Sequence, residues 1–144
     1  MRPPALLLLT ATSLGGCIVL DNVSSQTTAP YMEHPLTEVA GDPTRGRDVV
    51  LGRDGNCLLC HAVPETGARF MGNLGPPLTG IASRMSAGEV RLRLVDSRRV
   101  NPQTIMPSYY STDGLVDVAA AYRGKTVLTA QQIEDTIAYL RTLR

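Results

Sequence analysis

The chain has few large aromatic side chains: among its 144 residues there is no Trp, one Phe and five Tyr. Such side chains usually dominate small protein cores, so we expect another apolar body to fill part of this core. An excess of charge is also lacking. The formal net charge of +1 argues against a nucleic-acid-binding protein and against a disordered acidic tail. The length allows one domain of about 100 residues once an export signal is set aside.

Cysteine is scarce as well, and three copies, at positions 17, 57 and 60, exclude a dense disulfide framework. Two of the three are separated by only two residues and are followed at once by His61. We therefore interpret this pair as attachment points for a cofactor, which the motif below identifies.

The start of the chain has the layout of an export signal, with Arg2 before an apolar stretch over residues 5–14 and small residues after it. We predict a signal peptide over residues 1–16. Leu14-Gly15-Gly16-Cys17 also resembles a lipobox, whose cleavage leaves a lipidated Cys17 as the first mature residue. Cleavage near Ala29 and an uncleaved anchor are the alternatives, although the stretch is short for a membrane span. Each version places the rest of the chain outside the cytoplasm, in a bacterial periplasm or tethered to the membrane beside it.

The remainder divides into a flexible leader over residues 17–40, rich in Ser, Thr and Pro, and one domain over residues 41–144. The domain contains three helix starts and no sustained strand alternation. The sequence thus predicts an all-α, loop-rich domain. The helix starts are Asp42 before Pro43, a capping box of Ser86 with Glu89, and a capping box of Thr129 with Gln132.

The motif Cys57-Leu58-Leu59-Cys60-His61 is typical of covalent haem attachment. A spacing of three residues on a helical turn puts both sulfurs on one side, where they can add to the two vinyl groups of one haem. His61 then reaches the iron from that same side. We predict one covalent haem c, held by Cys57 and Cys60 and ligated by His61, which also supplies the apolar body that the core lacks.

Two other chemistries use paired cysteines. A thioredoxin-like redox pair needs a βαβ setting, which the sequence does not indicate. A zinc site needs a fourth ligand, and beyond Cys57, Cys60 and His61 only His34 or an isolated carboxylate remains. Both fit the sequence less well than haem.

The stretch Gly75-Pro76-Pro77-Leu78-Thr79-Gly80 suits a rigid loop on the His61 side of the haem. The Pro76 carbonyl can accept a hydrogen bond from the second imidazole nitrogen and so fix the tautomer of His61. An ordinary Pro/Gly turn is the alternative.

The sixth iron ligand is predicted to be Met106, in a loop stiffened by Pro107. Met32 lies in the leader, Met71 follows His61 too closely to round the haem edge, and Met85 is expected to pack at a helix start. Filling a gap in the core is the alternative for any Met.

Together these features resemble the class I cytochromes c, in which the last helix packs across the first near a glycine placed like Gly46. A closer resemblance is to the SoxX family, the small cytochrome subunits of the bacterial SoxAX complex, and it covers roughly residues 41–144. It rests on Asn56-Cys-Leu-Leu-Cys-His61, Phe70-Met-Gly-Asn-Leu-Gly-Pro76, Arg91-Leu-Arg-Leu-Val-Asp96, Asn101-Pro-Gln-Thr-Ile-Met-Pro107 with Tyr109-Tyr110, Ala121-Tyr-Arg-Gly-Lys125 and Leu128-Thr-Ala-Gln-Gln-Ile-Glu-Asp135.

The SoxX resemblance implies an electron-accepting subunit of a heterodimeric L-cysteine S-thiosulfotransferase. That enzyme oxidatively joins thiosulfate to a carrier-protein cysteine during periplasmic sulfur oxidation. The implied partners are a larger SoxA-like cytochrome subunit, the carrier protein through the complex, and a downstream cytochrome that accepts electrons. With Cys57 and Cys60 in thioether bonds and Cys17 lipidated or removed, no thiol remains, so the sulfur chemistry is expected on the partner. A free-standing periplasmic electron shuttle and a catalytic haem protein with an exchangeable sixth ligand are the alternatives.

The sequence leaves the roles of two groups of residues undecided. Arg91, Arg93, Arg98 and Arg99 either form a solvated face or dock an acidic partner. Tyr109 and Tyr110, beside the ligand loop, either line the haem edge or a subunit contact, or pack ordinarily in the core.

Overall fold

The computed structural model describes residues 30–144, and over that range it contains helices and loops without a strand. The all-α, loop-rich fold predicted from the sequence is confirmed. The predicted signal peptide, Cys17 and most of the predicted leader lie outside the described residues. No helix within residues 30–144 has the length and apolar character needed to cross a membrane. The helices are α1 (Pro43–Leu51), α2 (Ile81–Arg84), α3 (Ala87–Asp96) and α4 (Ala130–Leu140), with 3-10 turns η1 (Cys57–Leu59), η2 (Pro64–Thr66), η3 (Ser97–Arg99) and η4 (Ala120–Tyr122).

The three helix starts predicted from the sequence are confirmed. Asp42 caps α1 by accepting hydrogen bonds from two backbone N–H groups of the first turn, at 2.7 and 3.0 Å. Ser86 and Glu89 form a reciprocal capping box at the start of α3, and Thr129 and Gln132 form another at the start of α4. These caps satisfy N–H groups that have no partner inside their own helix, and so they define where each helix begins.

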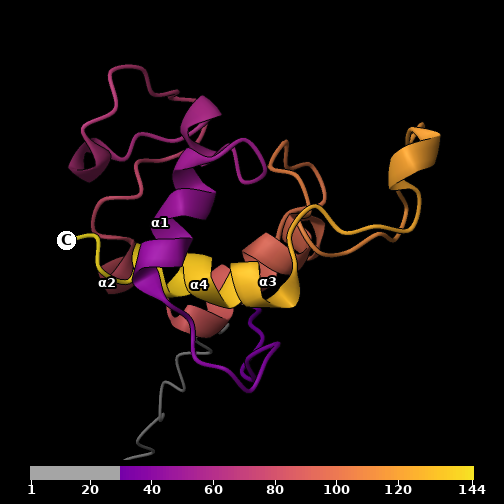
Figure 1. Cartoon of the computed structure of the whole chain (residues 1–144), viewed down its shortest axis with the longest axis horizontal. Helices are drawn as coiled ribbons and strands as arrows, with labels where there is room; N and C mark the ends of the chain where they lie inside the picture. The colour runs from indigo at the N-terminus through magenta and orange to yellow at the C-terminus, as the bar shows by residue number, and fades with distance from the viewer. Residues whose placement is uncertain (1–29) are drawn as a thin grey trace, which may run out of the picture.

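The first and last helices cross in direct contact (Figure 1). The crossing depends on Gly46, which is buried in α1. A Cβ atom at this position would overlap the backbone carbonyl of Asp135 and would lie 2.9 Å from the Cβ of Tyr139. Only a residue without a side chain allows the two backbones to approach this closely. The packing near Gly46 that the family resemblance implied is therefore present.

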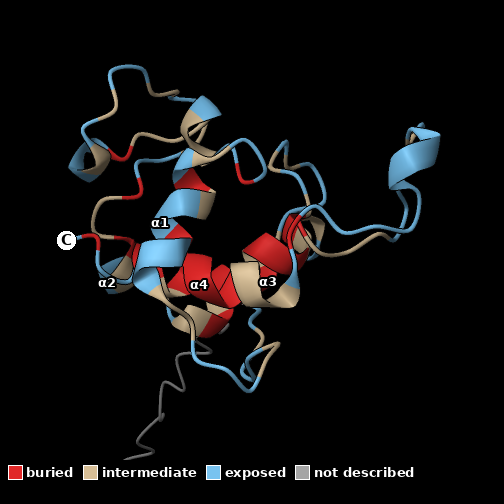
Figure 2. Cartoon of the chain, viewed as in Figure 1, coloured by how far each residue is buried: buried red, intermediate tan, exposed pale blue. Residues whose placement is uncertain are grey.

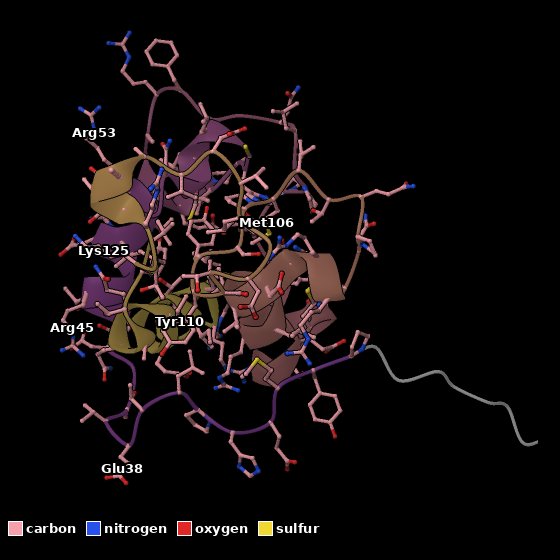
Figure 3. The ribbon with its side chains drawn as sticks, turned by 90° about the vertical axis from the view of Figure 1, so that its right-hand side faces the viewer. Glu38, Arg45, Arg53, Met106, Tyr110 and Lys125 are labelled. Atoms are coloured by element: carbon pink, nitrogen blue, oxygen red, sulfur yellow. The ribbon has the colours of Figure 1, made fainter. Side chains whose placement is uncertain are left out.

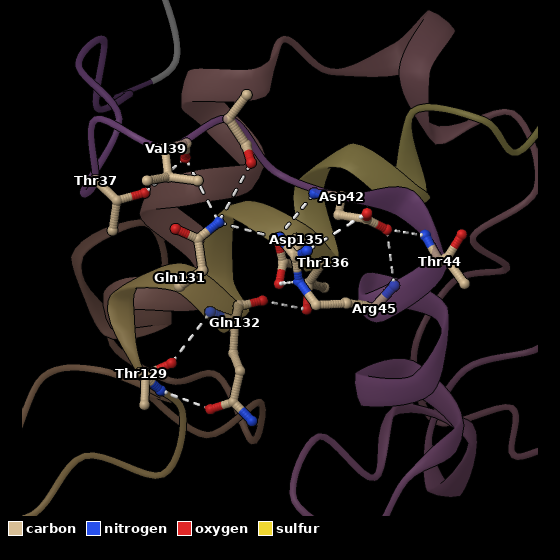
Figure 4. Close-up of polar contacts among 11 residues, drawn as sticks. Thr37, Val39, Asp42, Thr44, Arg45, Thr129, Gln131, Gln132, Asp135 and Thr136 are labelled. Atoms are coloured by element: carbon tan, nitrogen blue, oxygen red, sulfur yellow. Dashed lines mark hydrogen bonds and ion pairs between the residues drawn. The ribbon is translucent and has the colours of Figure 1, made fainter.

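Polar contacts reinforce this crossing (Figure 4). The carboxylate of Asp135 accepts a hydrogen bond from the backbone N–H of Asp42 at 2.8 Å and forms a two-pronged ion pair with Arg45 at 2.7 and 2.8 Å. Burial alone would raise the pKa of Asp135. The hydrogen bonds from Arg45, then Gln131, then the Asp42 backbone outweigh it and hold that pKa below its usual value.

Part of the segment predicted as a flexible leader lies against the domain. The backbone N–H of Met32 donates to the carbonyl of Gly88 in α3 at 3.0 Å, and the N–H of Leu36 donates to Glu134 in α4 at 2.9 Å. Residues 31–36, which we call the strap, therefore connect these two helices along one side. The sequence of this segment, with turn-forming residues such as Pro35, does not predict the contact, because the residues that the strap contacts lie more than 50 positions away.

Arg91 holds the strap in place. Its guanidinium is buried, pairs with Glu134 through two hydrogen bonds of 2.8 and 2.9 Å, and donates to the backbone carbonyls of Met32 and Glu33. The suggestion that Arg91 belongs to a partner-docking face is therefore wrong, because the side chain is consumed inside the fold. Arg98 also has an internal partner, Asp96, at 3.1 Å.

Burial is concentrated where α3 and α4 pack together, whereas the segment from residue 113 to residue 127 projects away from the domain (Figures 1 and 2). Within this arm only Val118 is even partly covered. Its exposed side chains include Val116 at 82% and Tyr122 at 68%. Such a stretch of apolar surface on a long loop is typical of a binding surface.

Candidate haem-binding site

A largely apolar cavity of about 280 Å³ lies between the loop after α1, the α2–α3 region and the loop before the arm. All five residues predicted to bind the cofactor line it: Cys57, Cys60, His61, Pro76 and Met106. Their positions in the sequence span 50 residues, so the fold brings distant predictions together in one place. The apolar wall comes mainly from Leu74, Leu78, Ile81, Met85, Val90, Leu94, Ile105 and Leu140.

The two cysteines sit on a tight turn. The backbone N–H groups of Cys60 and His61 both donate to the carbonyl of Cys57, at 3.2 and 2.9 Å. Asn56, just before the turn, adopts a left-handed conformation with φ of 46°, a region that Asn tolerates better than most residues. Burial raises the pKa of the Cys57 thiol to about 11, so this group is a neutral thiol at neutral pH.

His61 is held by a rigid loop. Its Nδ1 lies 2.7 Å from the carbonyl oxygen of Pro76, which is the contact expected from the sequence. Gly75 lies flat against the imidazole, since a Cβ atom there would overlap the ring. The backbone N–H of Gly75 also donates to the carbonyl of Cys60 at 2.8 Å, which ties this loop to the cysteine turn. With Nδ1–H donating to Pro76, the Nε2 lone pair is the one left to bind a metal.

The methionines separate clearly by position. Met71 is occupied, because its sulfur accepts a hydrogen bond from the backbone N–H of Val63 at 3.1 Å. Met32 belongs to the strap. Met106 and Met85 both line the cavity. Met85, which the sequence predicts to pack at a helix start, therefore also lies at the candidate site. Figure 3 shows Met106 inside the outline of the molecule, away from edge residues such as Arg53.

The Met106 loop is fixed on both sides of the sulfur-bearing residue. Ser97 donates through its hydroxyl to the carbonyl of Met106 at 2.5 Å, and the N–H of Met106 donates to the hydroxyl of Thr104 at 3.1 Å. Ser97 is itself buried at the end of α3. The backbone of Met106 is therefore fixed in position, and the loop presents the Met106 side chain from there.

Tyr109 is a site residue whose role the sequence left open. It is buried, lines the cavity and donates its hydroxyl to the carbonyl of Gly55 at 2.8 Å. The Cys57 thiol reaches the same carbonyl at 3.6 Å. Burial, followed by the nearby cysteines, raises the pKa of Tyr109, so its phenol stays protonated and keeps donating. Tyr109 thus connects the loop that carries Met106 to the loop that carries Cys57.

The residues of the cavity fit a covalent haem. Two thiols on one turn, an imidazole with one nitrogen already engaged, and thioethers in the facing loops are the donor set that such a group needs. An apolar wall suits a porphyrin ring. Neither alternative is supported over residues 30–144, where no three His, Cys, Asp or Glu side chains are grouped to hold a metal ion and where no strand exists for a thioredoxin-like unit.

The chain belongs to the cytochrome c family, because the family model described as "Cytochrome c" matches residues 44–144. Membership implies a covalently bound haem c. Among solved structures, the chain is similar to SoxXA from P. pantotrophus, with a TM-score of 0.72 and 32% sequence identity over 78% of this chain and 89% of that chain. The resemblance to SoxX found in the sequence is thereby confirmed. No curated protein sequence gives a significant match.

Proposed function

We propose that the chain is the electron-accepting subunit of a SoxXA-type L-cysteine S-thiosulfotransferase. The observation that carries this proposal is the match to SoxXA over 89% of that chain, together with a cavity lined by the whole predicted donor set. The reaction joins the outer sulfur of thiosulfate to a cysteine sulfur of a carrier protein. One S–S bond forms, the S–H bond breaks, and one proton and two electrons are released. The electrons leave through this subunit, one at a time.

The roles of the site residues follow from their chemistry. Cys57 and Cys60 would form the thioether bonds to the haem, His61 would bind its iron through Nε2, and Met106 would supply a second iron ligand. The Pro76 carbonyl holds the imidazole in the required tautomer. A single haem c supplies a one-electron redox centre, and a thioether ligand favours its ferrous state. Because both cysteines of the described domain are used as anchors, the sulfur chemistry takes place on the partner subunit.

The proposed partner is a larger, SoxA-like cytochrome subunit, and the arm of residues 113–127 is the surface we assign to it. The arm is exposed along its length, carries several apolar side chains and has a balanced set of charges in Asp113, Asp117, Arg123 and Lys125. An apolar surface without strong charge is suited to a lasting contact between subunits. The carrier protein is reached through the complex, and a downstream cytochrome takes up the electrons.

We further propose that the chain is exported to the periplasm. This rests on the signal peptide predicted over residues 1–16, followed by the leader to residue 40 and the cytochrome domain over residues 41–144. Mass spectrometry of the exported chain distinguishes a lipidated Cys17 from cleavage further on.

Isolation from the native host tests the function. We expect the chain to co-purify with a larger haem-bearing protein, and the pair to conjugate thiosulfate to a carrier cysteine in the presence of an electron acceptor. The partner alone should lose most of its turnover, and adding the chain back should restore it. A monomer without effect on this reaction would instead support a free-standing shuttle, and rapid binding of carbon monoxide would support an exchangeable sixth site.

A further inference from the structure

Helix α3 presents one cation to a cavity that is otherwise apolar on that side. Val90, Arg93 and Leu94, one turn of the helix, all line the cavity. Arg93 is half-buried and is the one Lys or Arg among the described residues that line it. A guanidinium at the wall of an apolar cavity needs an anionic partner to offset the loss of water.

Within residues 30–144 no carboxylate forms an ion pair with Arg93, and that of Glu89 accepts hydrogen bonds from Ser86, which lower its pKa, as the charge of Arg93 also does. Arg93 donates to the backbone carbonyl of Glu89 in its own helix, at 3.1 Å, and forms no ion pair over residues 30–144. The neighbouring arginines differ: Arg91 is paired with Glu134 and Arg98 with Asp96. Since a guanidinium carries five N–H donors in a rigid fork, most of the donors of Arg93 remain available for a carboxylate in the cavity.

We propose that Arg93 binds a carboxylate of the ligand in this cavity, namely one propionate group of the haem. The proposal rests on the proposed function, because it takes haem c to be that ligand. A haem carries two carboxylates that must stay hydrated or be paired. At neutral pH the strongest pairing that this wall of the cavity offers is a two-pronged hydrogen bond from a guanidinium. Arg93 is thus a cofactor-binding residue in addition to the five predicted from the sequence.

This contact has an electrostatic consequence. A fixed positive charge at the wall of the cavity that holds the haem favours the ferrous form, which carries one positive charge fewer than the ferric form. The same guanidinium lowers the pKa of the carboxylate that it holds, so the carboxylate stays ionised throughout the neutral range. Loss of Arg93 should therefore lower the reduction potential and make it depend on pH.

The test compares Arg93→Gln, Arg93→Lys and the control Arg99→Gln, a change of an exposed arginine on η3, in the full haem-bearing chain. The readout is the reduction potential by spectroscopic titration between about pH 5 and pH 9. For Arg93→Gln we expect the equilibrium to move about tenfold toward the ferric form at neutral pH, or about 59 mV for one electron. A new pH-dependent step should appear. Arg93→Lys should lie between this variant and the wild type, and Arg99→Gln should change the equilibrium less than twofold.

Overlapping potential profiles for Arg93→Gln, Arg99→Gln and the wild type would overturn the proposal. If Arg93→Gln does not retain haem, the test passes to Arg93→Met, which also removes the charge, and a profile identical to the wild type would overturn the proposal equally. A wild-type chain that shows the bare polypeptide mass would contradict the proposed function itself, which separates that failure from an error about Arg93.

Discussion

His61 and Pro76 are joined by a 2.7 Å contact between the imidazole Nδ1 and the backbone carbonyl oxygen. The carbonyl can only accept, so the proton of the neutral ring resides on Nδ1 and the Nε2 lone pair is free. The loop can come this close because Gly75 has no side chain. A backbone contact thus sets the tautomer of the ring that the motif predicts to be an iron ligand.

Replacing Gly75 by Ala should displace His61, because the added methyl would overlap the imidazole ring. We expect haem incorporation to fall severalfold and the folded state to lose about 1–3 kcal/mol. Absorption spectra and urea unfolding of the exported chain measure both effects. The control is Asn73→Ala, an exposed change in the same loop. Equal haem content in the two variants would contradict the role assigned to the close packing of Gly75.

Replacing Met106 by Ala should abolish the thioether-to-ferric charge-transfer band and lower the reduction potential, since the thioether favours ferrous iron. Met85→Ala is the matched control, because this second methionine lines the same cavity. We expect the band to survive in Met85→Ala. Loss of the band in that variant and retention in Met106→Ala would exchange the roles of the two residues.

The buried pair of Arg91 and Glu134 should be essential to stability. Glu134→Gln leaves the guanidinium of Arg91 buried without a charge partner and weakens the acceptor of the strap N–H at Leu36. Breaking a buried pair on one side costs about 3–5 kcal/mol, whereas exposed Glu38→Gln should change the free energy of unfolding by less than about 0.5 kcal/mol. Urea unfolding decides between these values. The double change Arg91→Met with Glu134→Leu should recover much of the loss, and failure to do so would show that the strap contacts dominate.

Asp135 should make the α1–α4 crossing sensitive to acid. Its pKa is lower in the folded chain than in the unfolded one, so its contribution is complete above the unfolded value of about 4 and is lost as the pH falls through the folded value. Asp135→Asn should therefore destabilise the chain by about 1 kcal/mol at neutral pH and converge with the wild type in acid. Asp48→Asn, an exposed change on α1, serves as control. A constant difference at every pH would exclude this ionisation as the cause.

Val116→Asp should weaken the subunit contact that we assign to the arm, because it places a charge on a side chain that is 82% exposed in the free chain. We expect the Kd for the larger subunit to rise at least tenfold, about 1.4 kcal/mol, with no change in the spectrum of the chain. Thr126→Asp adds the same charge to the same arm at a polar position and should have a smaller effect. Titration calorimetry provides the measurement. Equal effects of both changes would indicate that charge, and not the apolar surface, controls the contact.

Local signals allowed much of this molecule to be predicted from its sequence. The starts of α1, α3 and α4 follow from capping residues within one turn of each helix, and the Cys57 to His61 motif has its geometry built into its spacing. Pro76 could be matched to His61 because a Pro-rich loop has few conformations. The predicted helix starts depend on neighbours in the sequence, which is why the structure confirms them.

The features that escaped prediction depend on distant partners. The sequence pattern predicts Arg91 to be a surface cation of its helix, and only the fold shows that Glu134 lies beside it. Tyr109 gave no sign of its bond to Gly55, 54 residues away. Arg93 could not be distinguished from its neighbours until the cavity was seen. In each case a polar residue gains its role from what the fold places against it, and periodicity does not encode that placement.

The contact between α1 and α4 also constrains the order in which the domain can fold. Asp42 and Asp135 are 93 residues apart, so this contact closes a loop that spans most of the domain and cannot form before α4 is present. The cysteine turn lies inside that loop. Before α4 docks, the turn that carries Cys57 and Cys60 is not yet enclosed by this contact, and we expect haem attachment to be easiest at that stage.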